Sequence, residues 1–238
     1  MPRRSTAALL ATLSLVLPTG CGRDDTPDDA SSAPTATGEP WYDEIAVAGA
    51  DGEVGRAGTP CPLPLTFPLA EGWRPETVEL PETVELPETV ELPESAPSGN
   101  PDAQLGAELA AALGRRGGAT VRCEVDGRRA GAGFLRVWAV DQSAVTPRAA
   151  LADFLADTSV EQTVEPRYRD VTAGDFAGVE VTWLSRSELL DEENRNWAVA
   201  VRADERTLLF TVSEGLLAER TDVLPAYRLA TRGLRASG

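Results

Sequence analysis

The densest group of acidic side chains beside aromatic residues lies in the stretch SRSELLDEENR, between Trp183 and Trp197. A glycoside hydrolase needs two carboxyl groups about 5 to 10 Å apart across a cleft, one as acid and one as base or nucleophile. The spacing of these acids does not separate such a pair from a solvated loop. A carboxylate-based hydrolase therefore stays an alternative, and its candidate acids are Glu188, Asp191, Glu192 and Glu193.

The same stretch places two leucines among its acids, Leu189 and Leu190. Apolar side chains exposed together on a surface mark places where a protein or an apolar ligand binds. Glu188, Leu189, Leu190 and Asp191 are therefore the candidate partner-binding loop. The other interpretation is a capped helical turn whose leucines fold back onto the core.

The composition limits the chemistry available to the whole chain. It contains no histidine, and 22 basic residues, all of them arginine, face 38 acidic ones, for a formal net charge of -16. Without imidazole, a Ser-His or Cys-His nucleophile pair and an ordinary catalytic zinc site are excluded. An acidic surface also argues against binding to nucleic acid. We expect no catalytic residue, no cofactor, no metal site and no nucleic-acid partner.

Residues 1–20 have the order of an export signal. Arg3 and Arg4 precede an apolar run, Ala7 to Leu17, that is too short to span a bilayer, and small residues follow it. The residues LPTGC resemble a bacterial lipobox. The resemblance implies that Cys21 carries lipid, with acyl chains such as palmitate, and becomes the first residue of the mature chain. An ordinary secretory signal cut nearby is the alternative.

The next segment, residues 21–40, is rich in Asp, Ser, Thr, Pro and Ala and has no apolar periodicity. Such a composition predicts a disordered tether. Its aspartates at 24, 25, 28 and 29 fit a solvated charge run better than a cation site. Two acyl chains hold a protein firmly at a membrane, so we expect a lipid-anchored protein on the extracytoplasmic face of the bacterial cell membrane.

The two remaining cysteines, Cys61 and Cys123, form an even pair in a chain that is expected to enter an oxidising compartment. A disulfide between them is the economical prediction. The bridge would close a loop of about 60 residues and stabilise the fold by about 4 kcal/mol in the chain-entropy treatment. A metal site is disfavoured, because two thiols without histidine make half a zinc site.

Residues 75–95 repeat the hexad PETVEL three times and begin a fourth copy. A proline in every hexad withholds backbone donors, which excludes an interior strand and breaks a helix. We expect a low-complexity loop on the surface, where an insertion costs little stability. The alternative is that the repeat itself is the working element of the molecule.

Residues 41–238 are expected to form a single α+β domain. Pro62 and Pro64 would confine a first strand, Cys61 to Phe67, to a sheet edge. Helix signals follow at Asn100, at Thr146-Pro147 and at Thr221 or Asp222. Alternation predicts two further strands, Ala119 to Val125 and Gly133 to Val140. In the first of them, Val121, Cys123 and Val125 would share one face.

Three alternating segments between Phe176 and Ser213 predict an antiparallel meander. A register that pairs Trp183 with Trp197, and Trp197 with Val212, places apolar residues opposite one another in every row. In this register one face of the meander is buried and the other is polar. In the first hairpin, the buried rows also pair Val181 with Val199 and Val179 with Val201. In the second, they pair Val201 with Leu208 and Val199 with Phe210. The polar face carries Glu180, Thr182 and Thr211.

The order of hairpin, helix, meander and C-terminal helix resembles the LpqN-type lipoproteins of actinobacteria, which have a PsbP-like α/β/α sandwich. The segments that carry the resemblance are GFLRVWAVD, GVEVTWLSRSELLDEENRNWAVAV and LPAYRLATRGLR. It implies an α+β fold, an antiparallel sheet packed with helices, and a non-enzymatic binding or accessory module tethered in the cell envelope. The partner would be an envelope protein or a small apolar ligand. The alternatives are a hydrolase of cell-envelope sugars and a structural spacer.

Overall fold

The computed structural model describes residues 38–78, 114–140, 142–158, 161–187, 192–215 and 218–237. They belong to one compact unit, Ala36–Gly238, which is separate from the unit Met1–Thr35. The expected export signal, Cys21 and most of the expected tether lie outside the described residues. So do the helix expected from Asn100 and most of the hexad repeat.

Strands dominate the described part of the chain, with two α-helices and one short 3-10 helix among them. In chain order the elements are β1 (Ala50–Val54), β2 (Leu65–Ala70), β3 (Arg74–Thr77), β4 (Arg115–Arg116), β5 (Ala119–Asp126), η1 (Arg128–Ala130), β6 (Phe134–Val140), α2 (Pro147–Ala156), β7 (Gln162–Ala173), β8 (Phe176–Ser187), β9 (Glu192–Ala203), β10 (Arg206–Ser213), α3 (Arg220–Arg232) and β11 (Arg235–Ala236).

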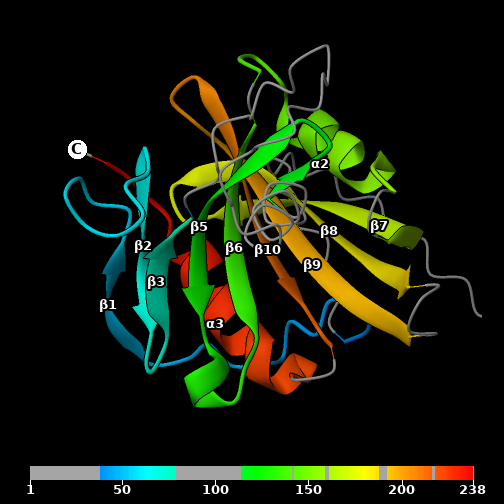
Figure 1. The fold of residues 1–238 in the computed structure, drawn as a ribbon, viewed down its shortest axis with the longest axis horizontal. Helices are drawn as coiled ribbons and strands as arrows, with labels where there is room; N and C mark the ends of the chain where they lie inside the picture. Colours follow the sequence, from blue (N-terminus) through cyan, green and yellow to red (C-terminus); the bar gives the residue numbers. More distant parts are fainter. Residues whose placement is uncertain are drawn as a thin grey trace, which may run out of the picture. The chain divides into compact units, whose positions relative to one another are not determined.

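These strands form two antiparallel sheets (Figure 1). The long sheet has the order β3-β5-β6-β10-β9-β8-β7, with β4 paired to β5, and the short sheet has the order β1-β2-β11. Pro62 and Pro64 precede β2 and leave its ladder intact, so β2 lies in the middle of its sheet. The prediction that the strand beginning at Cys61 lies at a sheet edge is therefore wrong.

The expected α/β/α sandwich, an antiparallel sheet packed with helices on both sides, is also wrong. The described fold is a β-rich sandwich in which α2 lies on one face of the long sheet, and α3 together with the short sheet lies on the other. Two segments account for the difference: residues 50–77 form strands of both sheets, and residues 162–173 form β7 at an edge of the long sheet. Strands thus occupy a layer that helices were expected to fill.

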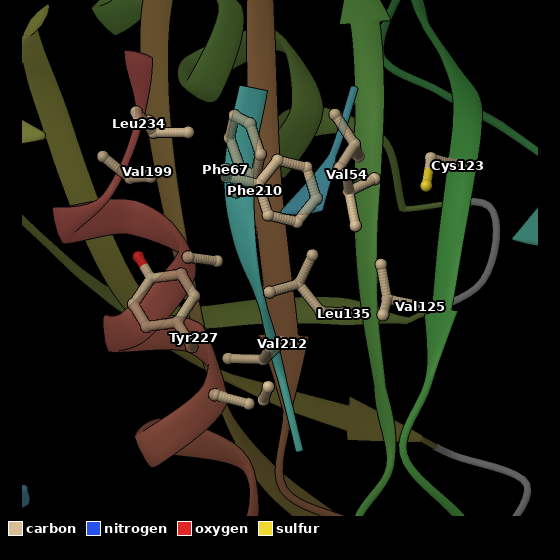
Figure 2. Packing of buried hydrophobic residues seen from close by; sticks show 14 of the residues in the cluster. Val54, Phe67, Cys123, Val125, Leu135, Val199, Phe210, Val212, Tyr227 and Leu234 are labelled. Carbon is tan, nitrogen blue, oxygen red and sulfur yellow. The ribbon is translucent and has the colours of Figure 1, made fainter. Parts of the chain in front are cut away.

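The central strands of the long sheet are buried on both faces. On one face, Phe67 of β2 packs edge-on against Phe210 of β10, with ring centres 5.4 Å apart. Figure 2 shows this side of the core, where Tyr227 of α3 lies near Val212. On the other face, α2 buries Leu151, with its neighbours Phe154 and Leu155, against β8, β9 and β10.

This double burial explains which predicted registers are correct. Trp197 lies opposite Val212, as predicted, and the other predicted pairs between β9 and β10 are also confirmed. Between β8 and β9 the prediction is wrong by one residue, because Trp183 pairs with Asn196 and Thr182 pairs with Trp197. Both parities of these strands are largely apolar, so alternation alone does not fix their register.

The shift turns whole rows of side chains to the opposite face. Val181 and Trp183 pack under α2, whereas Glu180 and Thr182 share the α3 side with Trp197. A bulge in β5 has a similar effect, because it separates Val121, on the α2 side, from the two other residues expected to share its face: Cys123 and Val125.

The helix ends follow local capping chemistry. Thr146 caps α2, its side chain accepting a hydrogen bond from the Ala149 amide at 3.3 Å, with Pro147 in the first turn, as predicted. α3 begins earlier than predicted, because Glu219 is its N-cap and forms a reciprocal capping box with Asp222.

The disulfide between Cys61 and Cys123 is confirmed, with an S–S distance of 2.04 Å. It joins the segment before β2 to β5, and the Cys61 amide donates a hydrogen bond to the Thr77 hydroxyl at 3.1 Å. Thr77 ends β3, an edge strand that contains the first residues of the hexad repeat and pairs with β5. Pro75 is accommodated there because an edge strand tolerates the loss of a donor.

A buried ion cluster fastens the N-terminal part of the described chain to the sandwich. Asp43 accepts hydrogen bonds from Arg169 of β7 at 2.8 Å and from Arg228 of α3 at 3.0 Å. Arg169 also donates to Glu180 at 2.7 Å, and Glu180 accepts a further bond from the Tyr227 hydroxyl at 3.1 Å. We call these five residues the Asp43 cluster. Its hydrogen bonds connect the N-terminal segment, β7, β8 and α3.

We predict that Asp43→Asn lowers the free energy of unfolding by about 2 kcal/mol at neutral pH, because hydrogen bonds to a charged group are lost. The hydrogen bond from Arg169 holds the pKa of the Asp43 carboxyl below its ordinary value. The carboxylate therefore stabilises the fold above about pH 4, and this contribution disappears as the pH falls through the folded-state pKa. Urea unfolding at a series of pH values from 7 downward checks whether the difference in free energy of unfolding between the variant and the wild type becomes smaller.

Asp175→Asn is the matched control, since Asp175 is exposed and its contact with Arg235 is a surface pair at 3.4 Å. This variant should unfold like the wild type at every pH. A gap between Asp43→Asn and the wild type that stays constant over the acidic range would contradict the assigned role of the carboxylate.

Candidate aromatic cavity

A cavity of about 390 Å³ opens on the α2 side of the long sheet. Side chains from β6, β8, β9 and β10 form its floor, and β4, α2 and the segment after β10 form its rim. We call it the aromatic cavity, and its lining residues are Arg115, Arg116, Arg128, Gly133, Phe134, Arg136, Trp138, Phe154, Glu161, Trp183, Asn196, Thr211, Val212, Ser213, Glu214, Gly215 and Ala218.

The length of α2 explains where the cavity lies. A helix of 10 residues is roughly 15 Å long, whereas the strands β8 and β9, at 12 residues each, extend roughly 40 Å. Among the described elements, α2 is the helix that packs on this face, and it covers only part of the strand length. The cavity occupies the part of the face next to the end of α2 that carries Phe154.

Aromatic rings make up the apolar walls. Trp138 meets Phe154 edge-on with ring centres 5.1 Å apart, and its indole N–H donates to the Thr211 hydroxyl at 3.0 Å. Phe134 lies under two guanidinium groups, those of Arg128 at 4.7 Å and Arg136 at 5.5 Å from the ring centre. The walls can therefore hold a planar or apolar body by stacking and by burial.

The polar part of the floor is already committed to internal hydrogen bonds. The Asn196 amide donates to the Ser185 hydroxyl at 3.0 Å and to the Asn194 carbonyl at 3.0 Å, and its oxygen accepts from the Ser213 hydroxyl. This network fixes the Asn196 side chain beside Trp183, its partner on β8. The Asn196 side chain is therefore held in place, with both of its amide hydrogens and its oxygen in hydrogen bonds.

Two buried donors on the lining have no hydrogen-bond partner in the part of the chain that the structure describes. They are the indole Nε1 of Trp183, a side chain only 2% exposed, and the Nη2 of Arg116. The rest of the Arg116 guanidinium is held, because Nε donates to the Phe154 carbonyl at 2.9 Å and Nη1 to Glu161 at 2.8 Å. Leaving a buried donor unsatisfied costs about 1 to 3 kcal/mol.

The lining is rich in arginine although the chain as a whole is acidic. Arg128 pairs with Asp126 at 2.8 Å, and this hydrogen bond raises the pKa of Arg128, so the group keeps its charge. Arg136 pairs with Glu124 at 2.6 Å. The guanidinium of Arg115, in contrast, makes no hydrogen bond or ion pair with any other described residue, although its backbone pairs with Thr120 of β5. The rim beside β4 is thus the cationic end of the cavity.

The residues that sequence reasoning singled out do not form this cavity. Glu188, Leu189, Leu190 and Asp191, the candidate partner-binding loop, lie outside the described residues, as does the side chain of Glu192. Glu193 is described, and it forms an exposed pair with Arg186 at 2.9 Å. The structure therefore brings no described pair of these acids together.

The cavity residues were missed because Trp183 was assigned to the same buried face as Trp197. One signal could have located them. The segment NWAVAV is apolar at both parities, which indicates a strand buried on both faces, and Asn196 interrupts that pattern at one end. A polar residue buried at the end of such a strand needs local partners, and its neighbourhood is a candidate site.

Two further hollows in the described residues offer less. One, of about 310 Å³, is lined mainly by polar groups near Arg122 and Arg206, and the other, of about 100 Å³, belongs to the Asp43 cluster. Within the described ranges no group of three metal-binding side chains gathers. Neither described α-helix has the length and apolar character needed to cross a membrane.

We predict that Trp183→Phe costs about 1 kcal/mol less stability than Trp197→Phe in the ligand-free protein. Both changes remove similar ring area, but only the Trp197 indole gives up a hydrogen bond, to the Pro40 carbonyl at 3.0 Å. Urea unfolding followed by far-UV circular dichroism measures both costs. Trp138→Phe, which loses its bond to Thr211, is the control on the cavity side and should resemble Trp197→Phe. Equal costs for all three variants would show that the Trp183 donor is satisfied.

Comparison with known proteins identifies the family of the chain. No curated protein is similar enough to count as a match. A family described as uncharacterised lipoprotein matches residues 31–234, which include every described strand and helix up to the end of α3. Such a family is consistent with a membrane-associated place in the cell envelope. The chain belongs to this family of uncharacterised lipoproteins.

Proposed function

We propose that this lipoprotein is a non-enzymatic binding module of the cell envelope, and that its ligand site is the aromatic cavity. The observation that carries the proposal is the buried Trp183 donor, which has no partner among the described residues and lines a cavity of about 390 Å³. Pockets for small molecules are concave and mostly apolar, with a few placed polar groups, and their volumes begin near 300 Å³.

The anchor and the location belong to the same proposal. Cys21 would carry the lipid and hold the module at the extracytoplasmic face of the bacterial membrane. The disulfide between Cys61 and Cys123 supports an oxidising compartment, where such bridges persist. The LpqN-type relationship and the actinobacterial source stay predictions.

The absence of catalysis is likewise a proposal, and it is supported by the state of the acids on the lining. Glu161 is paired with Arg116 at 2.8 Å, and Glu214 lies 2.6 Å from Arg220. Both carboxylates are therefore engaged by arginines of the protein itself. The hydrolase of envelope sugars has no observation among the described residues in its favour.

We predict that Gly215→Trp abolishes binding of the neutral fluorescent probe N-phenyl-1-naphthylamine. Gly215 lines the cavity, and a Cβ built there meets no atom within 4 Å, so a large side chain can be added at the cavity edge without a clash at its Cβ. A fluorescence titration of the full-length chain carrying Cys21→Ser, which removes the acylation site and the need for detergent, measures the dissociation constant. The wild-type cavity should bind the probe in the micromolar range.

Gly49→Trp is the matched control. Gly49 is exposed, a Cβ there makes only an ordinary contact of 3.5 Å with Glu71, and the residue does not line the cavity. Both proteins carry the same N-terminal segment, so probe bound to that segment cancels in the comparison. Equal binding by the two variants would place the probe elsewhere and overturn the cavity as ligand site.

A further inference from the structure

Two buried donors on the lining, Trp183 Nε1 and Arg116 Nη2, have no partner among the described residues, and the one buried acceptor there without a hydrogen bond, Glu214 Oε1, lies 2.6 Å from Arg220 in an ion pair. The main acceptors already take part in one bond each: the Thr211 hydroxyl accepts from Trp138, the Asn196 oxygen accepts from Ser213, and Glu161 accepts from Arg116. A ligand that matches this lining must therefore bring acceptors.

One of the unpaired donors belongs to an arginine, and a second arginine lies next to it. The free Nη2 of Arg116 belongs to a guanidinium whose side chain is 11% exposed, and the guanidinium of the neighbouring Arg115 on β4 has no partner among the described residues. A guanidinium presents its N–H groups in a planar fork that matches a carboxylate or a phosphate. Both arginines line the same cavity as the Trp183 indole.

The apolar groups lie beside this cationic end. Arg116 stacks on the Phe154 ring at 4.6 Å, and Phe154 meets Trp138 edge-on. A molecule with one acidic group and one apolar body can therefore reach both parts of the lining at once. A neutral molecule would use the walls and leave the arginines unmatched.

We propose that the aromatic cavity binds an amphipathic organic anion, with its acidic group at the rim that carries Arg115 and Arg116 and its apolar body on the aromatic lining. The inference rests on the proposed function and adds the chemical class of the ligand. The net charge of -16 repels anions at long range, so the selectivity has to come from these short-range contacts.

The test compares two probes that share one aromatic frame. 1-Anilinonaphthalene-8-sulfonate is N-phenyl-1-naphthylamine with an added sulfonate, so the ratio of their dissociation constants isolates the contribution of the negative charge. In the full-length chain carrying Cys21→Ser, the sulfonate should bind about tenfold more tightly than the neutral probe. Arg115→Gln and Arg116→Gln should each reduce that ratio severalfold.

Arg206→Gln is the matched control, because Arg206 is an exposed arginine at the far end of β10 and does not line the aromatic cavity. Arg115 is exposed and its guanidinium is unpaired, so Arg115→Gln keeps the test valid even where Arg116→Gln fails to fold. Equal binding of both probes to the wild type would overturn the anion inference and leave the proposed function standing. Binding of neither probe would overturn the proposed function itself.

Competition experiments that displace the bound sulfonate probe distinguish two possible origins of an acidic ligand, the membrane and the surrounding solution. Palmitate represents an acid derived from membrane lipid, and 1-naphthoate represents a soluble aromatic acid. Tighter competition by palmitate assigns the ligand to the membrane, and tighter competition by naphthoate assigns it to the surrounding solution. Failure of both acids to compete would contradict the inference.

Discussion

The central strands of the long sheet are buried on both faces, and the other features of the molecule depend on this constraint. β9 places Trp197 and Val199 toward α3, and the small residues Ala198 and Ala200 toward α2. The alanines allow α2 to approach the sheet closely, because little side-chain volume lies between them. Where α2 ends, the same face carries larger side chains, and these become the walls and floor of the aromatic cavity.

The two tryptophans of the central hairpin show how differently the two faces are completed. The Trp197 indole donates to the Pro40 carbonyl and meets Tyr42 edge-on, so the last residue of the expected tether and the residues after it cover this ring. The Asp43 cluster then holds that segment in place through Arg169 and Arg228. Trp183, one strand away on the opposite face, keeps an unsatisfied donor beside a cavity. One face is completed by the protein itself, and the other is suited to a ligand.

Much of the local structure could be predicted from the sequence, because it depends on local signals. The cap at Thr146 and the pairing of Trp197 with Val212 follow from capping chemistry and from alternation. The disulfide follows from the even number of cysteines left in a chain that is expected to be exported. The strand β7 was not predicted, since Pro166 and an irregular register after Val164 interrupt its pattern at the sheet edge.

The fold class and the site depend on long-range packing, which periodicity does not encode. Alternation in β8 fits either register, because both of its faces find apolar neighbours, and only the covering layers decide between them. The short sheet stands where a helical layer was expected, because the choice of covering layer also depends on long-range packing. The cavity combines β4, α2 and four strands of the long sheet, so its residues are scattered through the sequence from Arg115 to Ala218.

The central claim, that the cavity holds an acidic amphipathic ligand, is tested most directly on protein taken with its anchor from the cells that make it. Native mass spectrometry of the wild type and of Gly215→Trp compares the small molecules that each carries. The account predicts an organic acid bound to the wild type and absent from the variant whose cavity is filled. Identical spectra of bound species for the two proteins would contradict it.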